Sequence, residues 1–137
     1  MSSDEVQIPY LNIERQGDIL NITFMHPHLT EEDNIDELGH LLFSQVDQHH
    51  VRQVVLNLAH VQFLTSSVIG KMITLHRKLH RNQGYLVLCS LTDRVTEVLN
   101  NSRLLDYFQI TSDPQSASER IAVLINSNPD DNISHTA

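Results

Sequence analysis

The sequence is poor in cysteine, in basic residues and in long apolar runs. Its 137 residues include one cysteine, Cys89, which excludes an internal disulfide and lies in an apolar run typical of a buried position. No apolar run approaches the roughly 20 residues of a transmembrane helix, so we predict no membrane span. The 9 Lys and Arg are outnumbered by 17 Asp and Glu, for a formal net charge of -8. Because a sequence-independent grip on nucleic acid requires a basic excess, we expect no direct binding to nucleic acid.

Targeting and enzyme signatures are also missing. The first residues, MSSDEVQIPYLN, have neither the basic leader nor the apolar segment of a secretory signal, so we expect a cytoplasmic protein. The chain contains no G-x-S-x-G nucleophile motif, no G-x-x-x-x-G-K-[ST] phosphate loop and no G-x-G-x-x-G dinucleotide motif. We therefore predict that the protein is not an enzyme, with no catalytic residue and no cofactor.

Histidine, by contrast, is abundant, with nine residues in the chain. His76 and His80 are four residues apart in a predicted helix, a spacing at which two imidazoles can share a metal ion. No H-E-x-x-H motif and no cysteine pair accompanies them. The pattern therefore favours exposed or partly covered histidines over a metal site, and we predict none.

Hydrophobic residues make up 40% of the chain, enough for one core, and their spacing predicts alternating strands and helices. The predicted strands cover residues 8–15, 18–24, 51–58, 85–91 and 107–111, the first two forming a hairpin and the third a central strand. The predicted helices start at Thr30, at the Ser66–Ser67 pair, at Thr92 or Asp93, and at Asp113 with Pro114 in the first turn. Gly84 is expected to end the connection that follows the second helix.

This order predicts an α/β fold with a mixed, mostly parallel sheet of about five strands and four helices. We expect one domain over residues 8–125. A flexible N-terminus, residues 1–7, would precede it, and a polar, disordered tail, residues 126–137, would follow it.

The segment Thr65-Ser66-Ser67-Val68-Ile69-Gly70 lies where a predicted strand passes into a helix. Ser66 is the predicted N-cap, which makes Ser67 the first helical residue with its hydroxyl outside the cap. A phosphoryl group is well tolerated there, because a helix start presents unpaired N–H groups and the positive end of the helix dipole. The alternative is that Ser66 caps the helix and Ser67 is an ordinary surface hydroxyl.

The longer segment VVLNLAHVQFLTSSVIG resembles the signature of the STAS domain, the anti-sigma factor antagonist family. That signature is an apolar strand, Asp-Leu-Ser, an apolar pair and Asp-Ser-Ser-Gly-Leu-Gly. The resemblance implies a small cytoplasmic domain that binds a kinase-type anti-sigma factor. This partner phosphorylates a serine of the motif, and a phosphatase reverses the reaction. By position, Ser67 matches the phosphorylated serine, and Ser66, the second candidate, matches the residue before it.

Four positions depart from the family pattern. Acids of the family are replaced by Thr65, by Asn57 and, near the first helix, by Thr30, and Val68 stands where the family has glycine. Fewer carboxylates lessen repulsion of an incoming phosphate, but they also remove groups that a partner could use for orientation. Val68 stiffens the helix start, where glycine would permit close backbone approach.

The sequence therefore predicts an anti-sigma factor antagonist-like interaction module in a partner-switching pathway. Its partner would be an anti-sigma factor or a related serine kinase. The predicted partner-binding residues are Thr65, Ser66, Ser67, Val68, Gly70 and Lys71. The alternative is a degenerate STAS scaffold subunit that has lost the phosphorylation switch and works in a signalling or lipid-transport complex.

Overall fold

The structure is a computed structural model that describes residues 11–25, 28–29 and 32–127. The predicted flexible residues 1–7, the helix start at Thr30 and most of the predicted disordered tail lie outside these ranges. The predicted domain limits therefore stay predictions.

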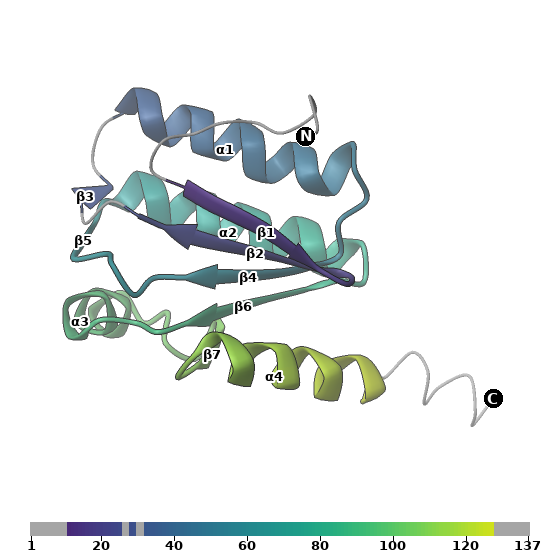
Figure 1. Cartoon of the computed structure of the whole chain (residues 1–137). Coiled ribbons are helices and arrows are strands. Elements are labelled where there is room, and N and C mark those ends of the chain that lie inside the picture. The colour runs from purple at the N-terminus through teal and green to yellow at the C-terminus, as the bar shows by residue number, and fades with distance from the viewer. Residues whose placement is uncertain (1–10, 26–27, 30–31, 128–137) are drawn as a thin grey trace.

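Within the described residues, five strands form one sheet in the order β1-β2-β4-β6-β7, and four helices surround it (Figure 1). β1 runs antiparallel to β2, and all other neighbours in this sheet are parallel. The strands are β1 (Leu11–Gln16), β2 (Ile19–Phe24), β4 (Gln53–Asn57), β6 (Tyr85–Cys89) and β7 (Gln109–Thr111), and the helices are α1 (Glu32–Asp47), α2 (Ser66–Arg81), α3 (Asp93–Asn101) and α4 (Pro114–Asn126). The α/β fold class with a mixed, mostly parallel sheet is thus confirmed.

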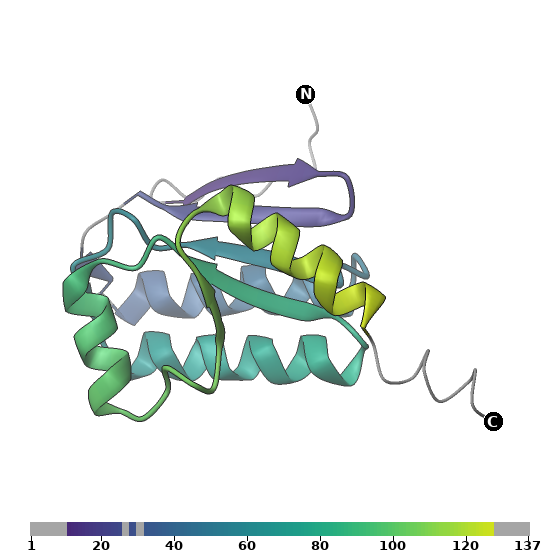
Figure 2. The ribbon, with the colours of Figure 1, turned by 90° about the horizontal axis from the view of Figure 1, so that it is seen from below.

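The sheet is covered on both faces. Helices α1 and α2 lie side by side on one face, α4 lies on the other, and α3 lies beyond the ends of the central strands (Figures 1 and 2). β4 is the central strand, as predicted, and is buried on both sides. Val54 and Leu56 belong to the larger core cluster under α1 and α2, whereas Val55 belongs to a second cluster under α4.

Two short strands were not predicted. β3 (His28–Leu29) and β5 (Phe63–Leu64) pair in parallel and form a separate two-stranded sheet. The pattern predicted a proline-interrupted connection over residues 25–29, because a strand of two residues has no periodicity to detect. Their pairing ties the segment that leads into α1 to the segment that leads into α2.

Gly84 ends the connection from α2 to β6, as predicted, since β6 begins at Tyr85. The residue with left-handed backbone is Gln83, with φ 64°, and not the glycine. Gly84 is required for space instead, since a Cβ atom there would collide with the backbone carbonyl oxygen of Arg52. The Tyr85 N–H donates to the same oxygen at 2.7 Å, which starts the pairing of β6 with β4.

Candidate functional site

Helix α2 begins one residue earlier than predicted. Thr65, not Ser66, is the N-cap: its backbone is extended, with φ −93° and ψ 165°, and its Oγ1 accepts a hydrogen bond from the Val68 N–H at 3.3 Å. Ser66 and Ser67 are therefore the first two helical residues. Threonine and serine are both good caps, so the sequence did not distinguish them. The tertiary structure does, because β5 ends at Leu64 and leaves Thr65 as the junction.

Both serines are exposed at this helix start. Within the part of the chain that the structure describes, neither hydroxyl has a hydrogen-bond partner, because Thr65 performs the capping. The backbone N–H groups of Ser66 and Ser67 precede the first intrahelical bond, which runs from the Ile69 N–H to the Thr65 carbonyl. The first turn of α2, wholly described, contains no acidic residue. A phosphate here would meet amide dipoles and no carboxylate of that turn.

The other residues predicted to bind a partner occupy different environments. Val68 is fully buried in the larger core cluster, so its side chain anchors the helix start to the sheet. Gly70 is exposed, and a Cβ atom built on it would meet no atom of the described residues within 4 Å. Lys71 is half-buried and directs its Nζ toward Asp36 of α1, 3.9 Å from Oδ1. Ser66, Ser67 and Gly70 thus form the accessible part of the predicted site.

The structure adds neighbours that the sequence analysis missed. Phe63 of β5, two residues before Thr65, is 43% exposed, and the Arg94 guanidinium lies 5.4 Å from its ring centroid. Arg94 comes from the first turn of α3. The Thr92 hydroxyl, which caps α3, also donates to the Val61 carbonyl at 2.7 Å and so joins the start of α3 to the segment that precedes β5. An apolar aromatic residue between a predicted strand and the serines was the available signal.

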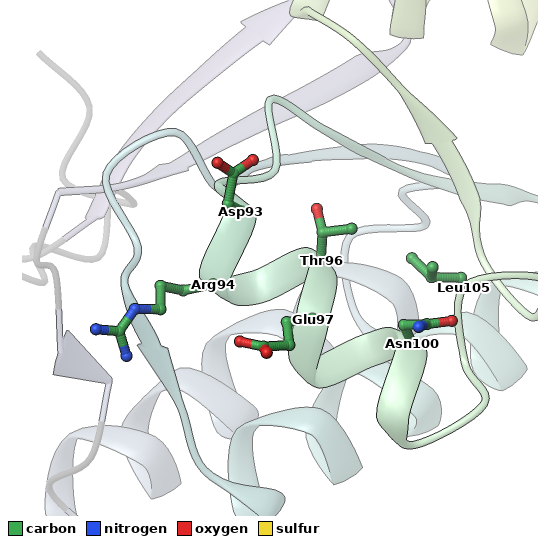
Figure 3. Close-up of a pocket in the computed structure, with 6 residues that line it drawn as sticks. All are labelled: Asp93, Arg94, Thr96, Glu97, Asn100 and Leu105. Carbon is green, nitrogen blue, oxygen red and sulfur yellow. The ribbon is translucent and has the colours of Figure 1, made fainter.

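A shallow hollow lies along the outer surface of α3, beginning at Arg94. Figure 3 shows Arg94 and Glu97 extending from one side of the helix and Asn100 facing Leu105 farther along it. The hollow is lined by Asp93, Arg94, Thr96, Glu97, Asn100 and Leu105.

Two further residues singled out in the sequence have local structural roles. The Asn57 side chain, which replaces a family acid, accepts a hydrogen bond from the Ala59 N–H at 3.0 Å and shapes the turn after β4. Cys89 is fully buried, as predicted, and burial raises the pKa of its thiol. Neither residue is accessible to a partner in the way the two serines are.

The histidine pair of α2 faces the segment between α3 and β7. The His76 ring makes edge contacts with Tyr107 and Phe108, at centroid distances of 4.9 and 5.8 Å. It is nearly parallel to the ring of His80, 6.3 Å away, and its Nδ1 is buried without a hydrogen-bond partner among the described residues. Burial, together with the nearby His80, lowers the pKa of His76. In the described ranges, no three His, Cys, Asp or Glu side chains are grouped to hold a metal ion.

Comparison with known proteins finds a matching family and a related protein. The family model described as the STAS domain matches residues 10–117. BtrV of Bordetella bronchiseptica, named as a candidate anti-sigma factor antagonist, is 32% identical over 85 residues, which cover 62% of this chain and 72% of BtrV. No helix among the described residues is long and apolar enough to cross a membrane.

Solved structures share the fold. A candidate anti-sigma factor antagonist from Thermotoga maritima matches with a TM-score of 0.72 and 17% identity, over 82% of this chain and 94% of that one. The Bacillus protein SpoIIAA, solved in its phosphorylated form, matches with a TM-score of 0.65 and 17% identity, over 81% of this chain and 98% of SpoIIAA.

Proposed function

Since the chain belongs to the STAS domain family, we propose that it acts as an anti-sigma factor antagonist, a cytoplasmic interaction module without enzymatic activity. It binds a kinase-type anti-sigma factor, which phosphorylates Ser67, and a phosphatase removes the phosphate. The family match and the printed name of BtrV support the antagonist role. The single observation that supports the phosphorylation switch is the exposure of the Ser67 hydroxyl, which has no structural role because Thr65 caps α2.

The exposed face at the start of α2 is suited to a close partner. Ser67 and Gly70 are three residues apart and share one helix face, and nothing in the described chain packs where a Cβ of Gly70 would lie. Glycine inside a helix is unfavourable unless something requires its small size. The approach of a partner to this face supplies such a reason, with Thr65, Ser66 and Lys71 at its border and Val68 holding the helix to the core.

Phosphorylation would alter this surface without altering the fold. A phosphate adds a charge of about -1.5 to -2 near pH 7 and is bulky. Because the hydroxyl of Ser67 is exposed and makes no hydrogen bond in the described part of the chain, its modification costs no contact of the hydroxyl itself. The phosphate weakens partner binding instead, through charge and steric conflict. The unmodified protein then captures the anti-sigma factor and releases a sigma factor, and the phosphorylated protein does not.

The test combines a native pull-down with an ATP reaction. The protein is expected to capture an ATPase of the kinase type. When ATP is added, this kinase is expected to transfer one phosphate to Ser67. Ser67→Ala should abolish the transfer, whereas Ser66→Ala, its matched control, should retain it. Ser67→Asp should abolish capture and leave the melting temperature nearly unchanged. The proposal fails if the captured kinase modifies a known family member but not this chain under the same conditions.

A second candidate function rests on the neutral residues around the serines. Thr65 and Asn57 stand in place of family acids, and both have structural roles here, as a helix cap and as a turn former. A scaffold subunit with a permanent interface would keep these roles and need no switch. Capture of membrane components or of a multi-subunit signalling assembly, without a kinase, would favour this scaffold over the switch.

A further inference from the structure

We propose that Lys71 is the intramolecular ligand of a phosphate on Ser67, and that phosphorylation moves its ammonium group from Asp36 to the phosphate. This inference rests on the proposed function, because it describes how the modified site is organised. Ser67 and Lys71 are four residues apart in α2, which brings their Cβ atoms to within about 6 Å on one side of the helix. A lysine side chain easily spans that distance to a phosphate oxygen.

The present partner of Lys71 holds it weakly. Its Nζ lies 3.9 Å from Asp36 Oδ1, beyond hydrogen-bond distance, and the Asp36 side chain is 74% exposed. Exposed ion pairs of this kind contribute little to stability. Lys78, two turns farther along α2, differs: its Nζ is 3.0 Å from Asp47 and 5.6 Å from the Phe43 ring centroid. Of these two α2 lysines paired with α1, Lys71 is the one more readily released.

A gap in α1 accommodates the Lys71 side chain in its resting position. A Cβ atom on Gly39 would lie 2.6 Å from Lys71 Cδ and 2.8 Å from its Cε, so the stem of the lysine crosses α1 where Gly39 lacks a side chain. The stem is thereby held while the ammonium end remains at the border of the two helices. Rotation about the bonds of the side chain redirects the charge without a change in the backbone of α2.

The exchange has a clear electrostatic direction. A phosphate with a charge of about -1.5 to -2 attracts the ammonium more strongly than the single charge of Asp36 does. Once Lys71 binds the phosphate, the phosphate is fixed against α2. The ammonium then neutralises about one of its negative charges. Asp36 loses its partner at the same time. The partner protein therefore meets an ordered, partly neutralised phosphate beside an unpaired carboxylate.

The experiment places phosphoserine at position 67 during translation, so that no kinase is required, and follows its phosphate by 31P NMR as a function of pH. The second ionisation has a midpoint near pH 6 for a free phosphoserine. Lys71 favours the dianion and lowers this midpoint. Lys71→Met is therefore expected to raise it by about 0.3–0.7 pH unit, and Lys71→Arg to keep it low.

Two further variants distinguish a direct contact between Lys71 and the phosphate from the long-range effect of any positive charge on α2. Lys78→Met removes the same charge about 16 Å away along the helix and should change the midpoint by no more than about 0.1 pH unit. Gly39→Ala occupies the space of the lysine stem, and should lower the midpoint by pushing Lys71 toward the phosphate. An unchanged midpoint in Lys71→Met, or an equal rise in Lys78→Met, overturns the proposal. Failure of a kinase to modify Ser67 would refute the proposed function and leave this titration unaffected.

Discussion

At the residue scale, the glycines of this protein show how a missing side chain can have an internal or an external reason. At Gly84 a Cβ atom would collide with the backbone of Arg52, just before β4, and at Gly39 it would meet the flexible stem of Lys71. Both are explained by contacts inside the molecule. Gly70 is exposed in the second turn of α2 and has open space around it. Among the residues that the structure describes, no contact explains Gly70, which is why we assign its reason to a partner.

The substitution Gly70→Ala separates folding from binding. We expect it to raise the free energy of unfolding by about 0.5–1 kcal/mol, because alanine is the better helix former, and to weaken capture of the anti-sigma factor. Thr74→Ala, one turn farther along the same exposed face, is the matched control and should retain binding. Urea unfolding and a pull-down titration measure the two effects. Unimpaired binding by Gly70→Ala would refute close approach at this position.

At the scale of elements, α2 is connected to its surroundings by three different contacts. The segment that leads into it is tied to α3 through the Val61 carbonyl and the Thr92 hydroxyl, and one side of the helix carries lysine pairs with α1. Its later turns carry His76 against the Tyr107 and Phe108 rings that follow α3. We expect the last contact to depend on pH, because the buried Nδ1 of His76 has no partner in the described part of the chain to stabilise an added proton.

The pH dependence follows from the pKa of His76, which burial lowers below its ordinary value of 6.5. The unfolded chain then binds a proton more readily than the folded chain does. The stabilising contribution of neutral His76 is complete above pH 6.5 and is lost as pH falls through the lowered folded-state pKa. In His76→Phe, thermal unfolding between pH 7 and 5 should show a smaller loss of stability than in the wild type.

His80→Gln serves as the companion variant, since it keeps the His76 ring and removes only the charge of His80 beside it. It should show an acid-side loss of stability between those of the wild type and His76→Phe. If His76→Phe lost as much stability as the wild type over this range, His76 would not be the group responsible.

At the scale of the whole molecule, the two faces of the sheet are stabilised separately. The face opposite α1 and α2 is covered by α4, whose Ala117 and Ile121 pack on Val55, Val87 and Cys89 (Figure 2). The candidate site lies at the start of α2, on the other layer. A defect under α4 should therefore lower the stability of the domain without changing the surface around Ser67.

Ile121→Ala is expected to lower the free energy of unfolding by about 2–5 kcal/mol, since it leaves a cavity under α4. This is a large share of the total of about 5–15 kcal/mol typical of a domain. Val123→Ala, on the same helix but 58% exposed, should change it by less than about 0.5 kcal/mol. Urea unfolding tests both, and partner capture below the melting transition should stay normal. Loss of capture by folded Ile121→Ala would show that the two layers are coupled.

Sequence periodicity determined most of the fold. The structure confirms the local signals of the apolar spacing of α2, the continuous apolar run of β4 and the cap Asp113. Of the two predicted starts of α3, Thr92 or Asp93, it selects Thr92 as the cap. Part of the candidate site was also predictable, since the sequence alone places two serines between a strand and a helix. The outward position of the Ser67 hydroxyl was predicted, whereas the release of Ser66 from the capping role was not.

Tertiary structure decided the details on which function depends. The choice of Thr65 as cap depends on where β5 ends, and β5 exists only because it pairs with β3, a segment 34 residues or more away in the sequence. The burial of Val68 and the position of Lys71 over Gly39 likewise require two segments to meet. Local propensity describes a residue and its neighbours along the chain, whereas these features arise from contacts between residues that only folding brings together.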